Sequence, residues 1–322
     1  MNALAELTDQ IRQSMELAHK RDIAQVMGML PTIHDIAIGD DCAAIPDGDG
    51  FLLLATEAYL NDFVASQPWF AGYCGVMVNV SDIYAMGGRP IAVVDALWSE
   101  GVAQAKPILA GLSAASAVYS VPVVGGHSNL RNDRPQLSVA ILGRANRLLS
   151  SFAAQPGQLL LAAIDLRGHF REPYLWWDAS SNAAPERLRL DLEILPQLAE
   201  AGLCAAAKDI SNAGVIGSVL MLLEASGLGG VIDITAIPRP PDMDLSSWLR
   251  CFPSYGFVLS VEPAHTSTVI ALFRQRDIVC APIGATDDTG QLRLNDGTNE
   301  QLLWDLHVTP LTSCGPIVAK QF

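Results

Sequence analysis

Long apolar runs are absent from this sequence. Half of its 322 residues are hydrophobic, but glycine, aspartate, serine or proline interrupts the apolar runs before they reach the ~20 residues needed to cross a bilayer. At the start, Glu6, Asp9 and Arg12 lie among Leu4 and Ile11, which predicts an amphipathic helix and not the apolar core of a signal peptide. We therefore expect no membrane partner and a cytoplasmic protein.

Basic residues and closely spaced cysteines are also scarce. The chain has 20 Lys and Arg residues against 34 Asp and Glu residues, and its formal charge is −14. Because lysine and arginine hold phosphate backbones, this composition argues against a nucleic-acid partner. The six cysteines form no C-x-x-C pair, so reduced, mostly buried thiols are expected and not a zinc site. The sequence G-x-x-x-x-G-K-[ST] does not occur, so any phosphate site must be of another kind.

Acidic residues, by contrast, interrupt apolar segments at three points between residues 40 and 82. Asp40 and Asp41 stand side by side between two apolar segments, Glu57 follows a strand-like run, and Asp82 breaks another apolar run. Carboxylates brought together repel one another, and a divalent cation offsets that repulsion. The three points therefore predict one anionic metal pocket, which becomes a nucleotide site if the cation also carries phosphates.

Each acid also has a structural interpretation. Asp40 and Asp41 could cap a turn or a helix start, and Asp82 could be a helix N-cap or a buried, hydrogen-bonded acid. Farther along the chain, Asp209 could bind a ligand or cap the helix expected from Gly214. Trp176 and Trp177 are adjacent and could stack on a heterocyclic substrate or pack in a core. The residues alone leave these alternatives open.

Helix-like and strand-like segments alternate along the chain. Helices are expected over residues 1–30, where Pro31 ends the run, and over 70–86, 109–119, 183–201 and 214–225. Strands are expected over residues 51–56, 91–96, 121–124, 136–143, 158–164 and 256–261, with 121–124 buried. The composition changes near residues 150–157, so we predict two α+β domains, residues 1–150 and 151–322.

Four ordered motifs cover nearly the whole chain. They are GDDCAAI at residues 39–45, SDIYAMGGRP at 81–90, GGHS at 125–128 and KDISNAG at 208–214. Their sequence and order resemble those of the aminoimidazole ribonucleotide (AIR) synthetase superfamily. Within it, thiamine-monophosphate kinase looks closest in its G-D-D-A-A-V, V-N-L-S-D-L-A-A-M-G-A-x-P and D-I-S-D-G motifs.

The resemblance implies both a fold and a site. It implies an N-terminal domain that forms a β-barrel with its twin across a homodimer interface, a C-terminal α/β sandwich, and ATP held with Mg²⁺ at the interface. The implied metal ligands are Asp40, Asp41, Glu57 and Asp82, and the implied nucleotide contacts are Asp40, Asp41, Asp82, Gly125, Gly126, His127 and Asp209. Glycine-rich turns at 87–88 and 125–126 would add backbone phosphate donors. The implied activity is ATP- and Mg²⁺-dependent phosphorylation or activation of a small molecule.

Three departures from the kinase pattern bear on this activity. His127 stands where Gly-Gly-Asp-Thr has its aspartate, Asn212 replaces the second aspartate of D-I-S-D-G, and residues 252–257 lack the acids of Gly-Glu-Asp-Tyr-Glu-Leu. Mg²⁺ prefers oxygen to imidazole nitrogen, so the changes predict fewer or weaker metal positions and a different acceptor. His127 could contact a phosphate, act as a general base or hydrogen-bond a neighbouring strand. A nucleotide-binding regulator without turnover, or a scaffold in a larger complex, is the alternative function.

Overall fold

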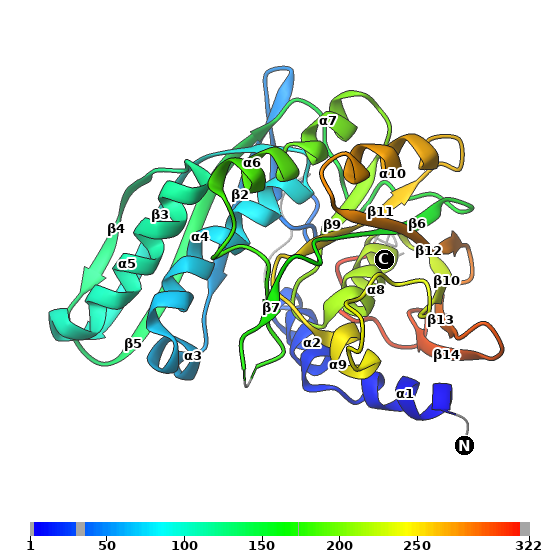
Figure 1. Cartoon of the computed structure of the whole chain (residues 1–322), viewed down its shortest axis with the longest axis horizontal. Helices are drawn as coiled ribbons and strands as arrows, with labels where there is room; N and C mark the ends of the chain where they lie inside the picture. The colour runs from blue at the N-terminus through cyan, green and yellow to red at the C-terminus, as the bar shows by residue number, and fades with distance from the viewer. Residues whose placement is uncertain (1–2, 30–35, 173, 316–322) are drawn as a thin grey trace. The chain divides into compact units, whose positions relative to one another are not determined.

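The computed structural model describes residues 3–29, 36–172 and 174–315 (Figure 1). Contacts group the chain into two compact units. The five-stranded unit comprises Asp41–Leu148 and Ser180–Gln197, and the seven-stranded unit comprises Met1–Asp40, Leu149–Ala179 and Leu198–Phe322. The expected α+β class is confirmed, whereas a domain boundary near residue 150 stays a prediction. No helix in the described ranges is long and apolar enough to span a bilayer.

The five-stranded unit contains one mixed sheet and four helices that belong wholly to it. Its strand order is β1-β2-β5-β3-β4, in which β3 and β4 are parallel and the other neighbours are antiparallel. The strands are β1 (Ala43–Asp47), β2 (Gly50–Ala58), β3 (Arg89–Glu100), β4 (Val123–Asn129) and β5 (Arg131–Ala145). The helices are α3 (Asn61–Ser66), α4 (Pro68–Ala85), α5 (Gly101–Tyr119) and α6 (Pro185–Leu192).

Helices α4 and α5 pack with their backbones in direct contact. A Cβ atom at Gly72 would lie 1.9 Å from the carbonyl oxygen of Ile108, and one at Gly111 would lie 1.8 Å from that of Trp69. Only glycine permits such an approach from both sides. Helix α4 is buried from Phe70 to Ala85, as expected for a helix that is apolar around most of its circumference. The glycine contacts therefore fix the axis of a helix that lies inside its unit.

The other side of the five-stranded sheet is exposed. Leu54 and Leu142 are paired across β2 and β5 and are 47% and 36% exposed, and Val94 on β3 is 42% exposed. Strand β4, at the sheet edge in Figure 1, is exposed along its whole length, and its Val124 is 64% exposed. Val121 is buried, but the strand begins at Val123 and is exposed, so the expectation of a buried strand at residues 121–124 is wrong for the strand itself.

The seven-stranded unit contains the second large sheet, in the order β14-β13-β10-β12-β6-β11-β9. Strands β10 and β13 are parallel, and the other neighbours are antiparallel. The strands are β6 (Leu159–Ile164), β9 (Ala206–Asp209), β10 (Gly229–Asp233), β11 (Gly256–Val261), β12 (Val279–Asp287), β13 (Gln291–Asn295) and β14 (Glu300–Asp305). The helices are α1 (Ala3–Arg12), α2 (Met15–Met27), α8 (Gly214–Ser226), α9 (Leu245–Arg250) and α10 (Thr266–Arg274). A small hairpin joins β7 (His169–Phe170) to β8 (Trp177–Asp178), and α7 (Ile194–Glu200) has residues in both units.

The core of the seven-stranded unit surrounds Trp248. Its indole is fully buried, meets the ring of Trp177 edge-on at 5.1 Å, and donates from Nε1 to the Pro238 carbonyl at 2.8 Å. Strand β11 and nearly all of β6 are buried without alternation, so both faces of these central strands are covered. The packing interpretation of Trp177 is therefore confirmed.

Two long helices expected from the sequence are each divided. The described residues 3–29 contain α1 and α2, because Ser14 begins a new helix and accepts a hydrogen bond from the Leu17 amide at 3.3 Å. Residues 183–201 likewise contain α6 and α7. Pro31, expected to end the first helix, lies outside the described residues. Apolar periodicity shows that a segment is helical but continues across such short breaks, so it does not locate them.

Candidate functional site

Asp41 and Asp82 come together in the five-stranded unit. Carboxylate oxygens of the two residues lie within 4.8 Å of one another. Asp82 is 6% exposed, and Asp41 is half-buried. Two carboxylates this close repel one another, and a shared proton or a cation relieves the repulsion. Mg²⁺ and other hard cations bind carboxylate oxygens, so the donor set fits such an ion.

Helix α4 determines the position of Asp82. The residue lies in the last turn, where its carbonyl oxygen accepts a hydrogen bond from the Met86 amide at 3.2 Å. The N-cap interpretation of Asp82 is therefore wrong. The carbonyl end of a helix carries partial negative charge, which disfavours an anion there. A buried carboxylate at this end, close to a second carboxylate, has a strong electrostatic reason to take up a cation.

The chain turns directly after α4. Gly87 has a positive φ of 73°, and a Cβ atom at Gly88 would lie 2.3 Å from Leu53 Cδ1 on β2. The sequence prediction of a glycine-rich turn at this point is therefore confirmed. The expected role of these amides as phosphate donors is wrong, because Gly87 donates to the Tyr84 carbonyl at 2.8 Å and Gly88 to the Ile83 carbonyl at 3.0 Å.

Asp40 anchors the turn that precedes β1. Its carboxylate accepts hydrogen bonds from Ser150 Oγ at 2.7 Å, Ser151 Oγ at 2.7 Å and the Ser151 amide at 3.0 Å. Gly39 has φ of 126°, and a Cβ atom there would lie 2.2 Å from Cys314 Cβ, so a side chain cannot replace its hydrogen. A strand follows this turn, so the helix-start interpretation of the acid pair is wrong. A metal-ligand role for Asp40 stays a prediction.

Glu57 and Tyr59 face the helix-covered side of the five-stranded sheet. Glu57 lies opposite Val139 of β5, and the Tyr59 amide donates to the Leu137 carbonyl at 3.1 Å. Val139 and Leu137 are both buried. Residues opposite one another in an antiparallel ladder project to the same side, which places Glu57 of β2 and Tyr59, just after β2, on the buried side. Glu57 is outside the close carboxylate group of the described residues, and its role as a metal ligand stays a prediction.

The environment of Tyr59 raises the pKa of its hydroxyl. Burial raises its pKa well above the ordinary value, and the negative charges of Cys74, Glu57 and Asp82 raise it further. Tyr59 is not among the residues predicted from the sequence. The available signal is its spacing of two from Glu57, which puts both side chains on one side of a strand.

Gly125, Gly126 and His127 lie within β4 and not in a turn, which corrects the expected glycine-rich turn. Nothing lies within 4 Å of a Cβ atom built at Gly125, whereas one at Gly126 would lie 2.3 Å from the Asp95 carbonyl oxygen. The exposed His127 imidazole lies 5.6 Å from the ring of Trp98. Gly125 therefore leaves space for a ligand to approach the strand, although a nucleotide contact here stays a prediction.

Asp209 ends β9 in the seven-stranded unit. It is 1% exposed, and its carbonyl oxygen accepts a hydrogen bond from Ser218 Oγ at 2.7 Å. Ala213, which has no side-chain cap, occupies the N-cap position of α8. The helix-cap interpretation of Asp209 is therefore wrong. Gly214 has φ of 64° and packs against the Leu249 carbonyl, which tightens the turn between strand and helix.

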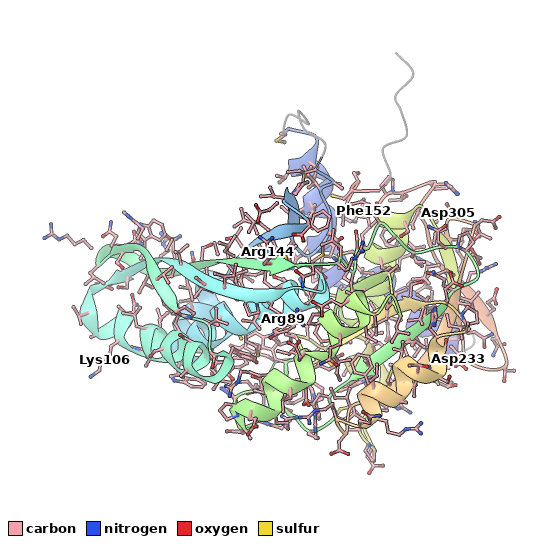
Figure 2. The ribbon with its side chains drawn as sticks, turned by 90° about the horizontal axis from the view of Figure 1, so that it is seen from above. Arg89, Lys106, Arg144, Phe152, Asp233 and Asp305 are labelled. Carbon is pink, nitrogen blue, oxygen red and sulfur yellow. The ribbon has the colours of Figure 1, made fainter. Side chains whose placement is uncertain are left out.

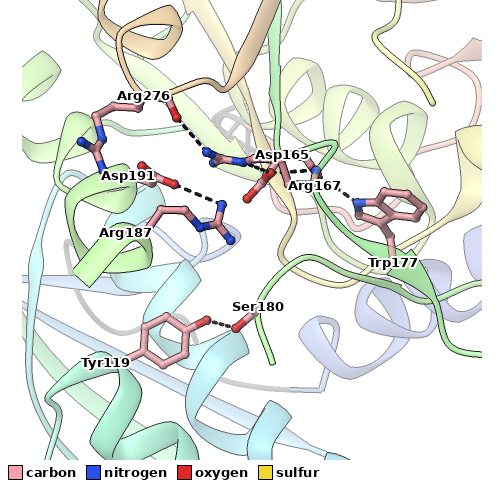
Figure 3. A network of polar contacts seen from close by, with 8 residues as sticks. All are labelled: Tyr119, Asp165, Arg167, Trp177, Ser180, Arg187, Asp191 and Arg276. Carbon is pink, nitrogen blue, oxygen red and sulfur yellow. Dashed lines mark hydrogen bonds and ion pairs between the residues drawn. The ribbon is translucent and has the colours of Figure 1, made fainter. Parts of the chain in front are cut away.

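Several other charged and polar residues have structural partners. Figure 2 shows Arg89 and Arg144, which lie opposite one another on β3 and β5 and pair with Glu193 and Asp47, respectively. Figure 3 shows smaller contacts within each unit. In the seven-stranded unit, Trp177 Nε1 donates to the Asp165 carbonyl at 2.9 Å. In the five-stranded unit, the Tyr119 hydroxyl and Ser180 Oγ share a hydrogen bond at 2.5 Å. These hydrogen bonds and ion pairs give each of these polar groups a structural role that needs no ligand.

The geometry defines a two-domain α+β protein with paired acids at the end of a buried helix. The N-terminal domain of AIR synthase related proteins matches residues 39–145, and their C-terminal domain matches residues 157–297. An uncharacterized protein of Synechocystis sp. is 48% identical over 316 residues, which are 96% of this chain and 98% of that protein. The chain therefore belongs to the AIR synthase related protein family.

More distant relatives have named activities. Phosphoribosylformylglycinamidine synthase subunit PurL of Thermomicrobium roseum is 26% identical over 314 residues, 88% of this chain and 42% of PurL. Thermotoga maritima PurL complexed with ADP has a TM-score of 0.76 at 18% identity and covers 96% of this chain and 54% of its own. AaThiL complexed with AMPPCP and TMP has a TM-score of 0.67 at 18% identity and covers 91% of this chain and 100% of its own. These structures confirm the expected AIR synthetase-like fold.

Proposed function

We propose that this protein is an enzyme that uses ATP and Mg²⁺ to phosphorylate or otherwise activate a small molecule in the cytoplasm. The observation that carries the proposal is the buried Asp82 at the carbonyl end of α4, within 4.8 Å of Asp41. Two acids in this position favour a cation, and an anionic nucleotide needs one because the chain has a charge of −14. The ADP and AMPPCP in the PurL and ThiL structures support a nucleotide as the cation's partner.

In this proposal, the carboxylates of Asp41 and Asp82 hold Mg²⁺, and Asp40 and Glu57 are additional ligands. Bound Mg²⁺ would neutralise phosphate charge and orient the transferred group. The serine hydrogen bonds to Asp40 hold its turn in place. The amides of Gly87 and Gly88 donate to the carbonyls of Tyr84 and Ile83 at 2.8 and 3.0 Å, so the proposal does not use these two amides as phosphate donors.

The nucleotide contacts of the proposal come from two other segments. Gly125 leaves space for a ligand to approach β4, Gly126 is the neighbouring proposed contact, and the exposed imidazole of His127 is available to an anion. Asp209 is the proposed binding residue of the seven-stranded unit, where Ser218 fixes the end of its strand. His127 is the contact best suited to a single substitution, because it is exposed, whereas Asp209 is buried and a side chain at Gly126 would meet the Asp95 carbonyl.

A second copy of the chain is the proposed partner of the five-stranded unit. Leu54, Val94 and Leu142 form an exposed apolar group on three neighbouring strands, and Val124 lies on an exposed edge strand. Contiguous apolar surface and an uncovered edge usually indicate an interface. We propose that a homodimer covers this face and completes a β-barrel across the interface.

The test is isothermal titration calorimetry of the full chain with AMPPCP in the presence and absence of Mg²⁺. The proposal predicts binding that requires the cation. Folded protein that binds neither Mg²⁺ nor AMPPCP would contradict it. Release of ADP or phosphate with a library of small metabolites then tests turnover, and binding without turnover with every candidate acceptor would favour the regulator.

A further inference from the structure

The hydroxyl of Tyr59 differs from three other buried tyrosine hydroxyls in the described residues. Its oxygen is inaccessible to solvent and has no hydrogen-bond partner among the residues that the structure describes. Tyr73 and Tyr119 share hydrogen bonds with Ser180 at 2.7 and 2.5 Å, and Tyr255 accepts one from a cysteine thiol at 3.2 Å. Native proteins rarely leave a buried hydroxyl unsatisfied, because desolvating it costs free energy. The exception therefore indicates that something else satisfies this group.

The position of Tyr59 places it on the side of the sheet covered by α4. Its amide bonds to Leu137, which is buried next to Val139 on β5. Helix α4 covers Val139: a Cβ atom at Gly75 would lie 2.8 Å from Val139 Cγ2, and Asn79 Nδ2 donates to the Val139 carbonyl at 3.1 Å. The next turn of α4 carries the buried acid of the close carboxylate pair. Tyr59 and that acid therefore lie in the same layer of the five-stranded unit.

The hydroxyl of Tyr59 is a hydrogen-bond donor without a described acceptor. A protonated phenol offers an O–H donor. The edge of its ring meets Phe63 at a centroid distance of 5.7 Å, which restricts how the ring is placed. No described oxygen accepts a hydrogen bond from the Tyr59 hydroxyl, and a hydrated cation or a phosphate group would bring an acceptor into the site.

We propose that Tyr59 is a binding residue of the Asp41–Asp82 site and that its hydroxyl donates a hydrogen bond to an oxygen of the ligand held there. The inference deepens the proposed function and rests on it. The acceptor is a water bound to the cation or a phosphate oxygen of the nucleotide. Both sources share the same chemistry, and titrations with the cation alone and with the nucleotide distinguish them.

The experiment compares wild-type protein with Tyr59→Phe, which removes only the hydroxyl. Mn²⁺ alone, and AMPPCP with Mg²⁺, are titrated into each protein. We expect the variant to bind AMPPCP with Mg²⁺ about tenfold more weakly, the effect of losing one hydrogen bond to a charged group. Weaker binding of Mn²⁺ as well would assign the acceptor to a cation-bound water. Loss confined to AMPPCP would assign it to a phosphate oxygen.

A second measurement separates binding from structure. Because the ligand-free hydroxyl has no described partner, Tyr59→Phe should leave the melting temperature of ligand-free protein unchanged or higher. Tyr73→Phe is the matched control: it removes a paired hydroxyl from the same unit, so it should lower the melting temperature and leave ligand affinity unchanged. A lower melting temperature for Tyr59→Phe with wild-type affinity would indicate a structural role and overturn the inference.

Other outcomes separate this inference from the proposed function. If folded wild-type protein binds neither ligand, the proposed function fails first, and the inference fails with it. If wild-type protein binds and Tyr59→Phe binds equally well, only the inference fails. Tyr59→Leu provides a second variant without the hydroxyl, and failure of both variants to fold would show that the group is required for folding and overturn the inference.

Discussion

The two units each contain a buried acid, Glu224 and Asp82, and the groups around these two carboxylates differ. In the seven-stranded unit, Glu224 accepts hydrogen bonds from the amides of Leu311, Thr312 and Ser313 at 2.8, 2.8 and 3.2 Å, and from the Thr312 hydroxyl at 2.5 Å. In the five-stranded unit, Asp82 lies within 4.8 Å of a second carboxylate. Four donors satisfy the first acid, whereas the second has a like charge beside it.

The difference separates structural acids from candidate ligand-binding acids. A carboxylate surrounded by N–H and O–H donors is stabilised by the fold itself. A carboxylate that faces another is stabilised when a cation arrives from solution. Asp40 is also hydrogen-bonded to three donors, although its place in the sequence pairs it with Asp41. The surroundings of an acid therefore distinguish neighbours that the sequence presents as equivalent.

The largest expected effect is on ligand binding by Asp82→Asn. The substitution keeps the shape of the side chain and removes the charge that we propose binds Mg²⁺. We expect Mg²⁺-dependent binding of AMPPCP to weaken about a hundredfold or more. Calorimetry measures the affinity, and thermal unfolding checks that the variant is folded. Wild-type affinity in a folded variant would remove Asp82 from the site.

The converse is expected for Glu224→Gln. An amide nitrogen replaces one acceptor and faces backbone donors, so the free energy of unfolding should fall by about 2–3 kcal/mol. The affinity for AMPPCP with Mg²⁺ should stay within about a factor of two of wild type, because a substitution that shares no partners with the ligand site has little effect on binding. Urea unfolding measures the stability change. Loss of affinity without loss of stability would show that the two kinds of acid are not distinct.

The contrast between the two faces of the five-stranded sheet predicts an effect on assembly. Val124→Glu places a charge on the exposed edge strand, and we expect it to shift a dimer toward monomer in light scattering after size-exclusion chromatography. Val308→Glu is the matched control, because Val308 is 77% exposed and lies in the seven-stranded unit. A monomeric wild type, or equal behaviour of the two variants, would contradict the proposed interface.

The fold could be predicted from two features of the sequence: the order of its motifs and the periodic spacing of its apolar residues. The helix around Asp82 and the strand before Glu57 were both expected, because apolar spacing records which side of an element is covered. The exposure of Val124 could not be found in this way. An apolar strand looks the same whether its own unit or another chain covers it, so the sequence alone could not show that β4 is exposed.

The site was only partly accessible to sequence reasoning. The sequence placed Asp40 and Asp41 together but could not show that Ser150 and Ser151, more than a hundred residues away, bind Asp40. The spacing of two from Glu57 places Tyr59 on the same side of the strand, but an unsatisfied hydroxyl is a property of packing that residue order does not show. Hydrogen bonds between residues far apart in the sequence therefore distinguish structural from ligand-binding side chains, and sequence motifs do not show these bonds.

The smallest expected effect concerns Asp95, whose environment is intermediate between the two kinds of acid. Desolvation raises its pKa above the ordinary value, and a backbone hydrogen bond only partly opposes this shift. Folding therefore favours the protonated form, so the cost of the charge is absent below the ordinary aspartate pKa and complete above the raised one. Asp95→Asn should be more stabilising at neutral pH than at pH values below the carboxyl range. Urea midpoints at several pH values measure this trend, and a constant difference would contradict it.

The most direct test of the account is electron paramagnetic resonance of Mn²⁺ titrated into the full chain with AMPPCP. The account predicts a saturable bound Mn²⁺ signal with coupling to the nucleotide phosphorus nuclei, lost in Asp82→Asn and retained in Glu224→Gln. A folded wild-type protein that gives no bound signal, or a signal that Asp82→Asn leaves unchanged, would contradict the claim that the Asp41–Asp82 pair binds a nucleotide-linked cation.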